Sequence, residues 1–245
     1  MLHLLIHVLL AVLSSKYPQK YPLNVHFLRN TDPGSNTPNK KKPPLKKIEI
    51  QDIKFSPLGD IVALGCKDNL VHLLSARNGY KHSGVCKGHG APIRTIDFSS
   101  DGAVLQSSDA TREVMHYEVA TGKRLLSAVQ FRDAVWSTFT SVYGWSVQGV
   151  FNNSEGVAAV DSDINCVDRS ADAKWLVTGG SNTVHNAIKL FNYPCLGDAV
   201  PSLHGGHTSP VLDVKLLTGT DGTIEVASAG GNDSCMFQWR LLEYK

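Results

Sequence analysis

The sequence has few cysteines, little net charge and no hydrophobic run long enough to span a bilayer, and each shortage excludes a class of protein. Its five cysteines lie far apart and form no CxxC pair, so neither a disulfide framework nor a cysteine-rich zinc motif is expected. The scattered thiols predict reduced, individually packed side chains and favour an intracellular compartment. A formal net charge of +2 on 245 residues is too small to indicate a nucleic-acid partner.

Motifs for nucleotide and metal chemistry are also absent. The chain has no Walker loop, no GxGxxG and no HExxH, and its aromatic residues are not spaced as a base-stacking platform. The segment 230–233 resembles a phosphate-binding loop only in its glycines, and we expect it to be a hairpin turn. We therefore expect no cofactor, no metal site and no nucleic-acid partner.

The longest apolar run, residues 2–13, lies at the N-terminus and is broken only by His3 and His7. It is too short to cross a bilayer, and its length suits the core of a signal peptide, but no Lys or Arg precedes it. A buried helix, a fragment boundary and a misassigned gene start are the alternatives for this leader, residues 1–15. No membrane contact is expected unless the leader is functional.

Residues 16–47 are predicted to form a linker. They contain six prolines and a lysine cluster over residues 40–47. A basic, proline-rich segment can touch an acidic surface such as a microtubule or a nucleic acid, but a solvated linker is the favoured interpretation.

Two Gly-His pairs, at residues 88–89 and 206–207, each open a stretch of short predicted strands, and the second stretch ends with Asp233 and Trp239. A Gly-His start with Asp and Trp near the end is typical of one four-stranded blade of a WD40-type β-propeller. A blade cannot bury its own faces, so this pattern predicts several blades packed side by side.

An alternating strand followed by a tight turn begins four times, at Ile50, Ile93, Ile164 and Val211. Spacings of 43 and 47 residues agree with a blade period of about 40–45, and the spacing of 71 indicates an insertion of about 28 residues. The sequence predicts an all-β, partial propeller of about four four-stranded blades. The expected blades are residues 48–87, 88–130, 131–205 with the insertion at its start, and 206–245 without an outer strand.

Four residues of the last blade, His207, Ser228, Asp233 and Trp239, match the positions of a hydrogen-bonded structural set. His207 is expected to bond Ser228 and Asp233, and the Trp239 indole to reach the serine. A hydrolase triad is the rival interpretation, but no Gly-x-Ser-x-Gly turn is present. We expect a structural role and no catalytic residue. A degraded set in the second blade consists of His89, Ser107 and Tyr117.

Several segments of the chain resemble the echinoderm microtubule-associated protein-like family, over roughly residues 48–242. The similarity includes Phe55-Ser56-Pro57-Leu58-Gly59, Cys86-Lys87-Gly88-His89 and the closing segment from Gly230 to Arg240. The insertion is the most diagnostic part, because a generic propeller does not share it. Its diagnostic residues are Trp136, Gly144, Trp145, Gln148 and Gly149.

The resemblance implies the last part of a tandem propeller that binds tubulin and associates with microtubules. The family's coiled coil and hydrophobic-motif region have no counterpart here, and four blades form an open arc. We therefore expect a truncated product, or one completed by another chain.

The expected function is a non-catalytic tubulin- and microtubule-associated scaffold in the cytoplasm and cytoskeleton. Its propeller surface is also expected to contact other proteins. The alternative is a general WD40 adaptor without tubulin affinity, and a hydrolase is the third hypothesis.

Overall fold

The structure, a computed structural model, describes residues 48–151, 163–181, 186–197, 199–219 and 221–242. The predicted leader and linker lie outside these residues. Residues Glu49–Lys245 form one compact unit. In the described part of the chain, no helix is long and apolar enough to cross a membrane.

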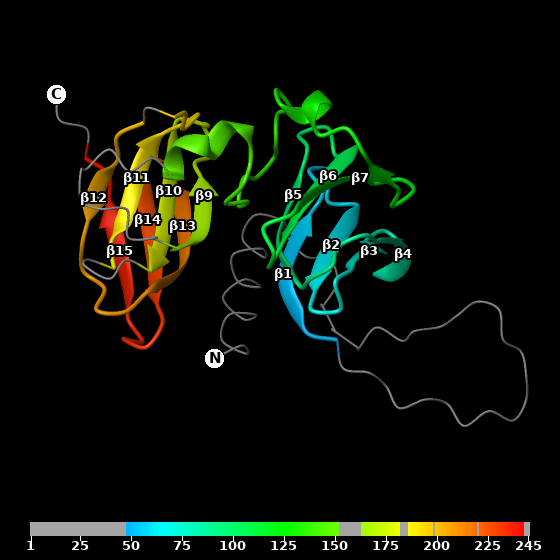
Figure 1. The fold of residues 1–245 in the computed structure, drawn as a ribbon, viewed down its shortest axis with the longest axis horizontal. Coiled ribbons are helices and arrows are strands. Elements are labelled where there is room, and N and C mark those ends of the chain that lie inside the picture. The colour runs from blue at the N-terminus through cyan, green and yellow to red at the C-terminus, as the bar shows by residue number, and fades with distance from the viewer. Residues whose placement is uncertain (1–47, 152–162, 182–185, 198, 220, 243–245) are drawn as a thin grey trace, which may run out of the picture. The chain divides into compact units, whose positions relative to one another are not determined.

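The described residues form four antiparallel sheets, each a meander of consecutive strands, which are blades 1 to 4 of a β-propeller (Figure 1). Blade 1 consists of β1 (Ile50–Phe55), β2 (Ile61–Cys66), β3 (Val71–Ser75) and β4 (Lys81–Cys86). Blade 2 consists of β5 (Ile93–Phe98), β6 (Val104–Asp109), β7 (Val114–Glu118) and β8 (Arg124–Leu125). Blade 3 consists of β9 (Asp163–Arg169), β10 (Trp175–Ser181), β11 (Ile188–Asn192) and β12 (Ser202–His204).

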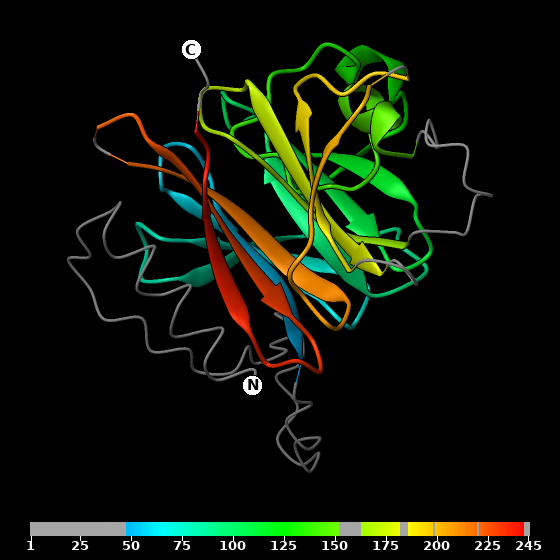
Figure 2. The same ribbon diagram turned by 90° about the vertical axis from the view of Figure 1, so that its left-hand side faces the viewer.

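Blade 4 has three strands among the described residues, β13 (Val211–Thr218), β14 (Ile224–Gly230) and β15 (Met236–Arg240). Figure 2 shows these three strands, coloured orange to red, next to one another. The predicted all-β propeller fold is confirmed.

The tight turn after the first strand of a blade is built in the same way three times. At the fourth turn position Gly59 and Gly102 have φ of +70° and +73°, and Ala173 has +55° in blade 3. The N–H of each donates to the carbonyl of the serine that begins the turn, at 2.8–3.0 Å. Glycine adopts this left-handed conformation without steric cost, whereas Ala173 adopts it at some cost in strain.

Where two neighbouring blades meet, the first residue of one blade's first strand packs against a glycine of the preceding blade. Ile93 and Val211 begin β5 and β13 and are fully buried. A Cβ added at Gly65 would lie 2.7 Å from Ile93 Cγ2, and one at Gly179 would lie 2.6 Å from Val211 Cγ1. Both contacts leave no room for a side chain, so these two glycines let adjacent blades approach closely.

The segment between blades 2 and 3 is irregular and is called the connection, residues 126–151. It contains two 3-10 segments, η1 (Val129–Phe131) and η2 (Trp145–Phe151). The last strand of blade 2, β8, has only two residues and ends at Leu125, where the connection begins. Buried side chains of the connection share a hydrophobic core with blade 3, including Trp136, Phe139, Val147, Val167 and Leu176.

All five cysteines are free. Four of them, Cys66, Cys86, Cys166 and Cys195, are buried, as expected for packed thiols. Cys235 differs because it is exposed in the β14–β15 hairpin. Burial raises the pKa of the Cys86 thiol to about 12, which keeps it protonated and unreactive at neutral pH.

Candidate functional site

The structure brings together His207, Ser228, Asp233 and Trp239 in blade 4. His207 lies 2.9 Å from Asp233 Oδ2 through Nδ1 and 2.9 Å from Ser228 Oγ through Nε2. The indole N–H of Trp239 donates to the same serine oxygen at 2.9 Å. The set therefore ties the loop before β13 to β14 and β15.

These four side chains satisfy one another and leave no reactive group exposed. The His207 side chain is 1 % exposed, and Ser228 Oγ already has two protein partners. Burial alone would raise the pKa of Asp233, but hydrogen bonds from His207 and the Cys235 backbone lower it. A serine held in this way has no path to a substrate, so its geometry suits a structural role in the sheet and not that of a nucleophile.

Replacing Ser228 with alanine should lower the free energy of unfolding by about 1–3 kcal/mol, because the Trp239 indole N–H and His207 Nε2 both lose their hydrogen-bond partner. Ser202→Ala is the matched control, since Ser202 is exposed on β12. Urea denaturation of both variants provides the measurement. Equal stabilities for the two variants would contradict a structural role for Ser228.

In blade 2 the corresponding histidine has an acidic partner that the sequence patterns did not reveal. His89 lies 2.8 Å from Ser107 Oγ and 3.0 Å from Asp109 Oδ2. Asp109 follows its serine by two residues and Asp233 follows its serine by five, so the linear spacing differs between the blades. Tyr117 is fully buried, its hydroxyl lies 3.2 Å from Met115 Sδ, and burial raises its pKa to about 12.

Charged side chains on the first strands link neighbouring blades. Asp52 accepts from Lys54 Nζ at 2.8 Å and, on the next blade, from the backbone N–H of Ile96 at 2.8 Å. Asp168 of blade 3 also bonds to the following blade: it accepts from Lys215 Nζ and from the N–H of Leu216, both on β13 and both at 2.7 Å. Each aspartate therefore caps a backbone donor of the following blade.

Asp97, which like Asp168 lies two residues before the serine of the turn, holds the connection. Its fully buried carboxylate accepts from the Thr138 hydroxyl at 2.7 Å, the Thr140 N–H at 3.0 Å and the Ser141 N–H at 3.2 Å. Burial raises its pKa, while Lys54 and the bonds from Thr138 and Thr140 act in the opposite direction. Burial lowers the pKa of Lys54, but Asp52 and Asp97 outweigh it, so this pKa is raised and the lysine stays charged.

The predicted insertion residues fall in two places within the connection. Trp136 is buried, forms a β-bridge with Ser99, and its carbonyl accepts from Arg169 at 2.7 Å. Gly149 lies against the loop after β11: its N–H donates to the Cys195 carbonyl at 2.9 Å. These contacts fasten the connection to blades 2 and 3.

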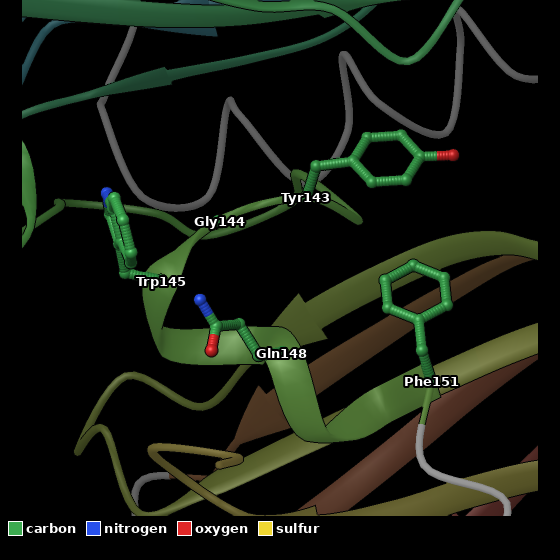
Figure 3. A pocket seen from close by; sticks show the side chains of 5 residues that line it. All are labelled: Tyr143, Gly144, Trp145, Gln148 and Phe151. Atoms are coloured by element: carbon green, nitrogen blue, oxygen red, sulfur yellow. The ribbon is translucent and has the colours of Figure 1, made fainter. Parts of the chain in front are cut away.

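Gly144, Trp145 and Gln148 line an open hollow together with Tyr143 and Phe151 (Figure 3). The hollow has a volume of about 350 Å³, and the Tyr143 and Phe151 rings are parallel with centroids 5.8 Å apart. Trp145 is 46 % and Phe151 47 % exposed. Figure 3 shows Trp145 on one side, Phe151 on the other and the Gln148 amide between them. This lining suits an apolar or aromatic side chain of another protein, with one amide for a hydrogen bond.

A smaller hollow of about 110 Å³ shares Gly144 and Trp145 with the first and is also lined by His116 of β7. The His116 ring stacks on Phe131, with centroids 4.5 Å apart, and lies beside Trp136 at 5.9 Å. Burial lowers the pKa of His116 from its ordinary 6.5 to about 4. The imidazole is therefore neutral at physiological pH.

This lowered pKa predicts that the protein loses stability in mild acid. The folded state holds His116 neutral. The stabilisation that the neutral ring gives the folded state is therefore present above pH 6.5 and is lost as the pH falls towards about 4. His116→Phe keeps the ring stack and removes the titration. We expect the melting temperature of the wild type to fall more steeply than that of His116→Phe between about pH 7 and pH 4.5. Parallel pH profiles would contradict this account.

Comparison with known proteins assigns the fold and the connection to one family. The model of the echinoderm microtubule-associated protein second beta-propeller matches residues 30–241, which includes all four blades. The chain belongs to this family. The predicted resemblance to echinoderm microtubule-associated proteins is thus confirmed.

Several relatives within the family are similar over the same part of the chain. Echinoderm microtubule-associated protein-like 3 from Homo sapiens is 34% identical over 200 residues, which are 79% of this chain and 21% of that protein. Echinoderm microtubule-associated protein-like 2 from Homo sapiens is 33% identical over 198 residues, 79% of this chain and 29% of that protein. The chain therefore spans less than a third of the length of these relatives.

Among solved structures, the crystal structure of the computationally designed Ika8 protein is similar in fold. It superposes with a TM-score of 0.54 at 21% identity, covering 81% of this chain and 60% of that chain. This likeness supports the propeller fold and carries no information about function.

Proposed function

We propose that this echinoderm microtubule-associated protein-like chain is a non-catalytic scaffold that binds tubulin on microtubules, in the cytoplasm and cytoskeleton. The observation that carries the proposal is the match to the second propeller of a family whose members are named for microtubule association. The proposal for this chain includes other protein partners on the propeller surface.

The buried polar groups favour binding over catalysis. The described Ser-His-Asp set of blade 4 is buried inside the sheet, whereas Trp145 and Phe151 of the connection are about half exposed. Exposed Trp, Tyr and Phe are enriched at the centres of protein interfaces, because they bury a large apolar area with little loss of side-chain entropy. The connection hollow is therefore the surface that we assign to tubulin.

Trp145→Ala should reduce co-sedimentation with microtubules at least about tenfold in apparent affinity, the effect expected of a central interface aromatic. The side chain is half exposed, so the melting temperature should change little. Leu58→Ala is the matched control, because Leu58 is 76 % exposed in the β1–β2 turn, outside the connection. If the two variants pellet equally, the hollow is not the tubulin contact.

The second candidate is a WD40 adaptor that lacks tubulin affinity, which the propeller surface alone would support. It predicts that the wild-type chain stays in the supernatant at physiological salt. Pelleting of the wild type with microtubules would exclude it.

A further inference from the structure

The β2–β3 hairpin of blade 1 brings three metal-binding side chains to one corner. Cys66 ends β2, Asp68 lies in the turn, and His72 is the second residue of β3. One donor atom from each lies within 4.8 Å of the other two. The antiparallel register, in which Leu64 pairs with His72, places the imidazole back over the turn that carries the carboxylate.

We propose that Cys66, Asp68 and His72 form a binding site for Zn²⁺. A thiolate, a carboxylate and a neutral imidazole are a donor set that zinc accepts, whereas Ca²⁺ and Mg²⁺ require oxygen ligands. The two negative charges of the thiolate and the carboxylate balance the charge of the ion. A water molecule completes the four-coordinate arrangement.

The distance between the imidazole and the carboxylate fits this assignment. His72 Nε2 lies 3.0 Å from Asp68 Oδ2. Two ligands at ordinary zinc bond lengths around a tetrahedral ion are about 3.3 Å apart, so a small opening of this pair admits the metal. A second imidazole, His82 of β4, lies beside His72 with ring centroids 5.9 Å apart.

A similar group in blade 2 shows why the assignment is specific to blade 1. His89, Asp109 and Glu113 also have donor atoms within 4.8 Å of one another. Both ring nitrogens of His89 are already used, by Asp109 at 3.0 Å and Ser107 at 2.8 Å. Among the described residues His72 has a hydrogen-bond partner at Nε2 alone, and only the blade 1 group contains a thiol.

Zinc binding at this corner must displace the thiol proton. Burial and the charge of Asp68 raise the pKa of Cys66 to about 12, so the thiol is protonated without a metal. A bound dication reverses this preference, because it stabilises the thiolate more than a proton does at neutral pH. Binding should therefore release a proton, and the affinity should rise with pH.

The test is a titration of the purified full chain with Co²⁺, a spectroscopic substitute for zinc, followed by displacement with Zn²⁺. We expect one saturable site with a thiolate-to-cobalt charge-transfer band in the near ultraviolet. Cys66→Ser should abolish that band, and Cys235→Ser, which alters an exposed thiol outside the site, should retain it. His72→Gln keeps a hydrogen-bond donor for Asp68 and should weaken the affinity at least about tenfold.

Thermal unfolding of each metal-free variant checks that the chain remains folded, and a folded His72→Gln variant keeps the test valid if Cys66→Ser fails to fold. The absence of a thiolate band in the wild type would overturn the proposal. A band that persists in Cys66→Ser, or an affinity unchanged in His72→Gln, would do the same.

Discussion

Asp97→Ala should lower the free energy of unfolding by about 3–5 kcal/mol, the cost of removing one partner from a buried charged network. The carboxylate is fully buried and accepts from Thr138, Thr140 and Ser141 of the connection. Alanine would leave these donors without an acceptor and would leave Lys54 with one fewer negative neighbour. The connection should then detach from the first strand of blade 2.

Urea denaturation measures this effect against two further variants. Asp97→Asn keeps the shape and one acceptor, so its loss should be smaller. Asp133→Ala removes a carboxylate that is 95% exposed and should change the stability by less than about 0.5 kcal/mol. A stability of Asp97→Ala within about 1 kcal/mol of the wild type would show that Asp97 does not hold the connection.

Gly149→Ala is the second substitution with a large expected effect. An added Cβ would lie 1.7 Å from the carbonyl oxygen of Leu196 and 3.0 Å from Cys195 Sγ. The obstructing atom belongs to the backbone, so no side-chain rotation relieves the clash. We expect a loss of about 3 kcal/mol or more in the free energy of unfolding, at the upper end of the range for overpacking.

Gly205→Ala is the matched control for Gly149, because nothing lies within 4 Å of the added Cβ at that position. It should leave the melting temperature unchanged or raise it slightly, since alanine restricts the unfolded chain. If Gly149→Ala unfolds at the same temperature as Gly205→Ala, the close contact between the connection and the loop after β11 is not tight in solution.

The repeat pattern of the sequence was sufficient to predict the blades. The starts at Ile50, Ile93, Ile164 and Val211 coincide with or lie within one residue of the first strands, because each alternating strand is followed by the same serine-led turn or hairpin. Local periodicity and turn chemistry operate within about ten residues, which is the range over which a strand and its hairpin are determined.

Contacts between blades could not be predicted from that local signal. Asp52, Asp97 and Asp168 bond to groups more than 40 residues away in the chain. On a strand an aspartate is a typical solvent-facing residue, and only the packing of the next blade, or of the connection in the case of Asp97, makes it an acceptor for these distant groups. The partner of His89 was missed for a related reason, since Asp109 lies at a different linear spacing from that of Asp233.

The hollow of the connection and the proposed zinc site in the β2–β3 hairpin are formed by the three-dimensional arrangement of their residues and not by a sequence motif. The family resemblance singled out Gly144, Trp145 and Gln148 as diagnostic residues. It did not include Tyr143, whose ring lies parallel to that of Phe151 in the hollow. No standard zinc spacing contains Cys66, Asp68 and His72, so the sequence led to an expectation of no metal site.

Tubulin binding by this chain is the central claim, and a quantitative co-sedimentation assay tests it most directly. The purified full chain, shown by circular dichroism and cooperative melting to be folded, is mixed with increasing concentrations of polymerised microtubules at physiological salt. The account predicts a saturable rise in the pelleted fraction that Trp145→Ala weakens. A folded chain that stays in the supernatant at every microtubule concentration would contradict it.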